Sequence, residues 1–216
     1  MGVAAARGLA AMMVLLSASG AAQAEDRDAA RIDWARGLVI AGGVGVADRH
    51  APSPAVARGT SRRGAEDAAK AALGVAIAAL PLAAGGTAGA RAHGALAAVV
   101  ELEAEPETDG AWHVVMAVPI EAVRQAVAGR GRPVAAAGDK GAAVVVIDGV
   151  PAMAKPAVGW TVGGSAAATL WVTALPAWAK DAPHVRVTGA TNGDLVAALP
   201  AGAGPGTLVL IVSGTR

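Results

Sequence analysis

The chain has 216 residues, a formal net charge of +1 at pH 7 and no cysteine, phenylalanine or tyrosine. The lack of cysteine excludes disulfides, thiolate metal sites and the acylated cysteine of a bacterial lipoprotein. The 18 bases nearly balance the 17 acids, and no basic run exceeds Arg62-Arg63, so we expect no nucleic-acid partner.

Residues 1–24 have the three parts of a secretory signal peptide. A basic region with Arg7 precedes an apolar run from Leu9 to Leu16, and small residues lead to Ala24. The apolar run is shorter than the roughly 20 residues that cross a bilayer, so we predict cleavage after Ala24. We therefore expect a periplasmic or secreted protein, or one held peripherally at the outer membrane, without a transmembrane anchor.

The segment Ile32 to Ala47 predicts one or two strands with a bend or bulge at its glycines. Asp48 to Gly59 contains two prolines and is predicted to form a loop. The glycines of "GGVGVADRH" invite comparison with a dinucleotide fingerprint, but that motif needs them at the turn directly before a helix. Because a long loop follows Gly45, we do not predict nucleotide binding.

A helix is predicted from a cap at Thr60 or Ser61 to a stop at Pro81. Its buried stripe has three- and four-residue spacing and consists of Ala65, Ala68, Ala69, Ala72, Leu73, Ala76, Ile77 and Leu80. The opposite face carries charges four residues apart, which predict the pairs Arg62/Glu66, Arg63/Asp67 and Glu66/Lys70. A solvated, self-paired face accounts for these charges without a ligand.

Two half-buried strands are predicted at Val100 to Glu105 and Ala111 to Val118, joined by a turn at Asp109-Gly110. A shift of one residue would turn the glutamates into the core, so the pattern specifies a register. That register pairs Leu102 with Met116, Ala104 with Val114 and Glu105 with His113. We interpret the last pair as a surface contact on the solvated face.

Three segments complete the first half and its boundary. Pro81 to Gly94 leaves two interpretations open, a loop or the approach to a second short helix. A short amphipathic helix is predicted over Ile120 to Ala128, between Pro119 and Gly129. Residues 129–141 have the composition of a linker or long loop, and they separate residues 25–128 from residues 142–216.

The C-terminal part, residues 142–216, is predicted to be β-rich. Its expected strands are Ala142 to Ile147, Ala167 to Ala174, His184 to Val187 and Thr207 to Val212. Turns are expected at Gly163-Gly164, Pro183 and Asn192-Gly193. The predicted fold class is α+β, with a helix on a small antiparallel sheet followed by this β-rich part, as one domain or two.

Catalytic motifs are weak throughout the chain. The sequence GGSA at residues 163–166 is not the G-x-S-x-G elbow of a serine hydrolase. The four histidines His50, His93, His113 and His184 lack the spacing of a zinc site. A hydrolase that uses Asp67 or Asp148 with a histidine has no spacing argument in its favour. We predict a non-enzymatic protein without a cofactor.

A strand, a proline-rich loop, a helix, an acidic hairpin and a short helix follow one another between Trp34 and Val127. The strand contains Gly43-Val44-Gly45, and the helix contains Arg62, Arg63, Ala65, Asp67 and Ala68. This stretch resembles the small bacterial lipoprotein family that shares a domain with the N-terminal part of flagellar assembly protein T. The resemblance implies a compact α+β domain exported to the periplasm or outer membrane, here as a non-lipidated variant, and no catalytic residues.

Two functions remain open. The first is a structural or protein-interaction module of the cell envelope, which binds an envelope partner through its sheet edges and the Asp48 to Gly59 loop. The alternative is a periplasmic sugar- or peptide-binding protein in which Trp160, Trp171 and Trp178 line a pocket. Buried bulk is the competing interpretation of these tryptophans, because the chain has no phenylalanine or tyrosine to fill its core.

Overall fold

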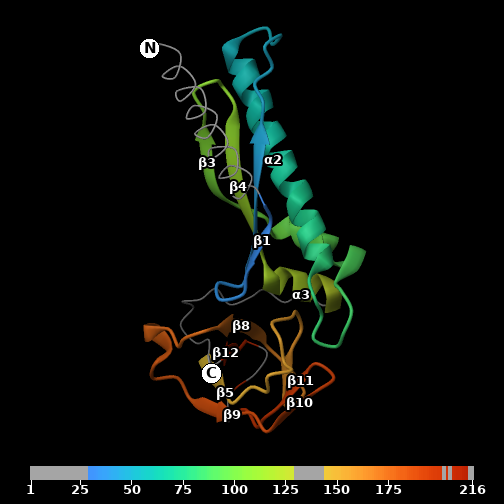
Figure 1. The fold of residues 1–216 in the computed structure, drawn as a ribbon, viewed down its shortest axis with the longest axis vertical. Helices are drawn as coiled ribbons and strands as arrows, with labels where there is room; N and C mark the ends of the chain where they lie inside the picture. The colour runs from blue at the N-terminus through green and yellow to red at the C-terminus, as the bar shows by residue number, and fades with distance from the viewer. Residues whose placement is uncertain (1–28, 129–143, 201–202, 204–205, 214–216) are drawn as a thin grey trace, which may run out of the picture.

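The computed structural model describes residues 29–128, 144–200, 203 and 206–213. The predicted α+β class is confirmed: a long helix lies on an antiparallel sheet in the first half, and a β-rich second half lies at one end of it (Figure 1). The predicted signal peptide and the predicted linker at residues 129–141 lie outside the described residues and stay predictions. None of the helices in the described part has the length and apolar character needed to cross a bilayer.

The first sheet is antiparallel throughout and has the strand order β1-β2-β4-β3. Its strands are β1 (Arg31–Asp33), β2 (Leu38–Gly45), β3 (Val100–Pro106) and β4 (Trp112–Pro119). The predicted bend at the glycines is found at Gly37, in the turn between β1 and β2, where a φ of 68° suits glycine. A bend or bulge at Gly42-Gly43 is not found, because β2 pairs with β4 in regular register through both residues. β2 and β4 form the centre of this sheet, and β3 lies at one edge.

Helix α2 (Pro54–Ala79) begins earlier than the sequence pattern indicates. The cap is Ser53, whose Oγ accepts a hydrogen bond from the Val56 N–H at 3.3 Å, and Pro54 opens the first turn. The prediction of a cap at Thr60 or Ser61 is wrong, and the preceding loop ends at Ser53 rather than Gly59. Proline favours a loop over a helix at most positions, but Pro54 lies in the first turn of α2, where its missing N–H costs nothing.

Helix α2 lies unusually close to β2 because two glycines of the strand face it. A Cβ on Gly43 would lie 2.5 Å from the backbone nitrogen of Ala69, and one on Gly45 would lie 2.6 Å from that of Ala65. Ser61 is buried in the same contact and donates a hydrogen bond to the Gly45 carbonyl at 2.5 Å. The G-x-G of the strand is therefore a packing contact between strand and helix.

The core of the first half lies between α2, β2 and β4 and contains the predicted stripe residues Ala65, Ala69, Leu73 and Ile77. The prediction that Ala68 belongs to this stripe is wrong, because Ala68 is exposed. Pro81 ends the run as predicted, and the ambiguous segment after it forms a bridge between Pro81 and Thr87 and then the 3-10 helix η1 (Gly89–Ala98). The predicted short helix is confirmed as α3 (Ile120–Ala128), which packs against η1.

The second half has two four-stranded sheets. The first is parallel throughout and has the strand order β8-β12-β5-β9. Its strands are β5 (Val144–Asp148), β8 (Ala168–Val172), β9 (His184–Arg186) and β12 (Leu208–Val212). The second, with the order β10-β11-β6-β7, consists of β6 (Thr161–Val162), β7 (Ser165–Ala166), β10 (Gly189–Thr191) and β11 (Asp194–Val196). Between β8 and β9 lies the short 3-10 helix η2 (Ala177–Ala179). The predicted turns at Gly163-Gly164 and Asn192-Gly193 are confirmed by positive φ at all four residues.

The two halves contact each other through backbone hydrogen bonds and through side chains that pack across the boundary, including Val158 and Trp34. Val158 donates to the Pro81 carbonyl at 2.8 Å and accepts from the Ala83 N–H at 2.9 Å. The backbone N–H of Trp171 donates to the backbone carbonyl of Trp34 at 3.1 Å. The Trp34 side chain packs against the cores of both halves, so it joins them.

Candidate functional site

Strand β3 is the longest edge strand among the described residues, and nearly all of its residues are exposed. It pairs with β4 alone, and all seven of its residues except Ala104 are exposed. The edge strands β1, β7, β9 and β10 have two or three residues each. The five-residue edge strand β8 is partly covered, because the backbone N–H of its Trp171 donates a hydrogen bond to the Trp34 carbonyl. The β3 edge is therefore the longest one open to solvent in the described part of the chain.

The register of the hairpin follows the prediction at its turn and departs from it at Leu102. The pairs Ala104–Val114 and Glu105–His113 are confirmed, and Gly110 has a positive φ of 86° in the predicted turn. The predicted Leu102–Met116 pair is wrong, because Glu101 lies opposite Met116 and Glu103 opposite Val115, with a bulge between them. Leu102 is 47% exposed and Val100 is 46% exposed, so the strand is not half-buried as predicted.

The bulge turns Glu101 toward α2, where it meets Arg62. The Arg62 Nη2 atom lies 2.9 Å and 3.1 Å from the two carboxylate oxygens of Glu101, and Nε lies 3.2 Å from Glu66. The guanidinium carbon is 5.3 Å from the centre of the Trp112 ring, within the range of a cation–π contact. The hydrogen bond and the negative charge of Glu101 raise the pKa of Arg62 above its ordinary value.

These contacts change the interpretation of the charged face of α2. The predicted Arg62–Glu66 and Glu66–Lys70 pairs are present, the second at 3.9 Å. The predicted Arg63–Asp67 pair is absent from the described residues, and Arg63 donates to the Gly59 carbonyl instead. The face is not merely solvated and self-paired, because Arg62 fastens α2 to the edge strand.

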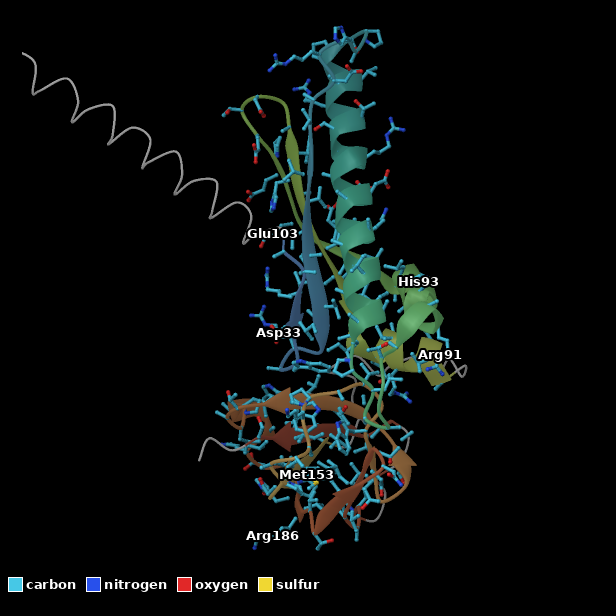
Figure 2. The ribbon with its side chains drawn as sticks, turned by 45° about the vertical axis from the view of Figure 1, so that its right-hand side comes forward. Asp33, Arg91, His93, Glu103, Met153 and Arg186 are labelled. Atoms are coloured by element: carbon cyan, nitrogen blue, oxygen red, sulfur yellow. The ribbon has the colours of Figure 1, made fainter. Side chains whose placement is uncertain are left out.

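Glu103 and Glu105 point to the other side of the sheet. They lie two residues apart opposite Val115 and His113, and Figure 2 shows Glu103 on the side of the hairpin away from α2. Both residues are exposed, and within the described ranges neither forms an ion pair. The strand thus presents one glutamate that Arg62 neutralises and two that no described basic residue neutralises.

A cavity of about 300 Å³ lies where the loop after α2 meets the second half. Its wall consists of Ala83, Ala84, Gly85, Met153, Ala154, Trp160, Ala190, Thr191, Asn192 and Gly193. Trp160 is only 7% exposed, and its indole N–H donates to the Lys155 carbonyl at 3.1 Å. The cavity therefore offers alanine side chains, the exposed Met153 side chain, a little of one indole and the polar groups of the Thr191 to Gly193 turn.

The other two predicted pocket residues do not line this cavity. Trp171 is 4% exposed and packs against Trp160, with 6.1 Å between ring centres and 57° between ring planes. Trp178 is 60% exposed on η2. Buried bulk describes Trp160 and Trp171 well, and a pocket that all three tryptophans line stays a prediction.

One acid–histidine contact joins residues far apart in the sequence. The Asp148 Oδ2 atom lies 2.6 Å from His184 Nδ1, on the adjacent strands β5 and β9. The two side chains are 45% and 47% exposed, and no hydroxyl of the described residues makes a hydrogen bond to either. Among all the residues that the structure describes, no three or more His, Cys, Asp or Glu side chains lie close enough together to hold a metal ion. The pair has the geometry of a surface contact.

Comparison with known proteins gave no match to a protein-family model, to a curated protein or to a solved structure. The resemblance to the flagellar assembly protein T domain therefore stays a prediction from the residues of the first half.

Proposed function

We propose that the protein is a non-enzymatic, exported protein of the cell envelope that acts as a protein-interaction module in the periplasm or at the outer membrane. Export rests on the signal-like residues 1–24. Interaction rests on one observation, the exposed edge of the seven-residue strand β3. An open sheet edge accepts an extended segment of another protein by strand addition.

Two features of β3 favour a selective partner. The bulge at Leu102 and the glutamates of the strand are devices by which edge strands resist uncontrolled pairing. Neither the bulge nor the glutamates block the backbone N–H and C=O groups on the outer side of β3. A partner that tolerates the bulge and complements the charges can still pair, whereas an apolar strand of another protein is disfavoured.

The loop that precedes α2 extends the proposed surface. A Cβ on Gly110, in the β3–β4 turn, would lie 3.3 Å from the Cβ of Ala47. The exposed residues that follow Ala47, including Asp48 and His50, therefore adjoin the turn. In Figure 1 the β3–β4 turn and this loop lie at the same end of the first half, so the proposed surface includes both.

The test is crosslinking in cells that express the protein, with a tag at Arg216 and mass spectrometry of the crosslinked species. We expect envelope proteins to be recovered, at levels above those from a strain with an unrelated tagged periplasmic protein. Recovery of the monomer alone, or of cytoplasmic proteins, would contradict the proposal.

A second candidate, binding of a sugar or peptide, is favoured by the cavity beside Trp160. Its test is a titration with a panel of sugars and short peptides, followed by tryptophan fluorescence. A response from Trp160 would be lost in Trp160→Phe and kept in Trp178→Phe, whose indole is exposed elsewhere. No response to any member of the panel would remove this candidate.

A further inference from the structure

The outer edge of β3 combines free backbone with an uneven distribution of charge. Side chains two residues apart on a strand share a face. On the face toward α2, Glu101 is neutralised by Arg62 at 2.9 Å. On the opposite face, Glu103 and Glu105 have no ion pair within the described residues. The two unpaired negative charges therefore lie two residues apart, on one face of β3 only.

A second copy of this chain is a poor occupant of the edge. Pairing of β3 with β3 would bring glutamates opposite glutamates, and like charges directly opposite each other destabilise a sheet. An anionic lipid surface would repel the same side chains. The charge of the edge thus favours a basic partner over both of these.

Building on the proposed function, we infer that the partner segment is an extended strand of another protein with lysine or arginine at alternate positions. It adds beside β3 as a fifth strand and sets two basic residues next to Glu103 and Glu105. Cross-strand neighbours have Cβ atoms about 4.5–5.5 Å apart, which is close enough for ion pairs. The backbone hydrogen bonds supply affinity, and the two charge pairs supply selectivity and register.

Arg62 is a positioning residue for this edge. Its bidentate contact with Glu101 ties β3 to α2 beside the bulge, and its guanidinium lies over Trp112 in the neighbouring strand. An edge that is held in place loses less conformational freedom when a partner strand is added. Arg62→Gln should therefore weaken binding although Arg62 does not touch the added strand.

The test measures fluorescence anisotropy of labelled peptides with the full mature chain. The first peptide alternates lysine with valine, the second groups the same lysines at one end, and the third replaces lysine by glutamate. We expect the alternating basic peptide to bind and the acidic peptide not to bind. The double variant Glu103→Gln/Glu105→Gln should weaken binding at least about threefold. The matched control Glu107→Gln, which alters a glutamate just beyond the strand, should change little.

Hydrogen exchange locates the contact. With the alternating basic peptide bound, the amides of β3 should exchange more slowly, while those of the second half stay unchanged. Equal binding of the two lysine peptides without protection of β3 would mean simple charge attraction and would overturn the inference. Tighter binding of the acidic peptide would overturn it as well.

The crosslinking in cells separates this inference from the proposed function. Envelope partners recovered in cells, together with no β3 protection by the alternating basic peptide, would leave the proposed function standing and overturn the basic-strand inference. If neither experiment detects a partner, both fail together. A circular dichroism spectrum of each variant checks that it is folded, which we expect because the altered glutamates are exposed.

Discussion

The two halves of the molecule use their sheets in different ways. In the first half, α2 covers one face of an antiparallel sheet, and the edge strand β3 stays open to solvent. In the second half, the central strands β5 and β12 bury consecutive residues on both faces, and Trp34 partly covers the edge strand β8. The longest exposed strand edge of the described residues thus lies in the first half, which is why the proposed interaction surface is there.

The largest expected change in the free energy of unfolding comes from a residue in the core between the two sheets of the second half. Leu195 is fully buried between its two sheets, so Leu195→Ala should lower the free energy of unfolding by about 3–4 kcal/mol. The adjacent Val196 is 44% exposed, and Val196→Ala should cost less than about 1 kcal/mol. Urea denaturation measures both. Equal losses would show that the second half lacks the closed core described here.

The next effect tests the contact between α2 and β2 in the first half. Gly45→Ala would force the new methyl group into the α2 backbone and should cost about 3 kcal/mol. Gly59 lies within α2 with no atom near the position of its Cβ, so Gly59→Ala should stabilise the protein by about 0.5–1 kcal/mol. Thermal unfolding distinguishes the two variants. If Gly45→Ala is tolerated, the close approach of α2 is wrong.

A smaller effect concerns the hydroxyl buried in the same contact. Ser61→Ala leaves the Gly45 carbonyl without its partner and should cost about 1–2 kcal/mol. Thr60 is exposed and bonds only to carbonyls of its own helix, so Thr60→Ala should change stability by less than about 0.5 kcal/mol. Chemical denaturation gives both values, and a larger loss for Thr60→Ala would contradict this account.

The smallest effect compares two neighbouring arginines of α2. Arg62 bonds to Glu101 and Glu66, whereas Arg63 bonds only to a helix carbonyl. Arg62→Gln should speed amide exchange in β3, and Arg63→Gln should leave it unchanged and cost less than about 0.5 kcal/mol. Equal exchange in the two variants would show that Arg62 does not fasten the edge strand.

Helix α2 and the β3–β4 hairpin of the first half are predictable because the patterns that specify them are local in the sequence. Helix α2 is visible in the three- and four-residue repeat, and the β3–β4 hairpin in its alternation. The bulge is not visible, because the residues from Val100 to Glu105 alternate without a break. It brings Glu101 to Arg62, which lies 39 residues earlier in the chain. No local pattern reports a contact of that kind.

In the second half, strands are predictable but their neighbours are not. β12 is the last strand in the chain and lies between β5 and β8. Parallel neighbours are joined by long crossovers, and here these carry short strands instead of α-helices. The Asp148–His184 contact between β5 and β9 follows from the same strand order, so the sequence alone does not predict it.

The most direct test of the central claim is photo-crosslinking in cells from a single position on β3. A photoreactive residue at Glu105 should trap an envelope protein, whereas the same residue at Val75, which is 74% exposed on α2, should trap much less. Glu103→Gln in the first variant should reduce the trapped product. Crosslinks of equal yield and identity from both positions, or from Val75 alone, would contradict the claim that the edge of β3 is the interaction surface.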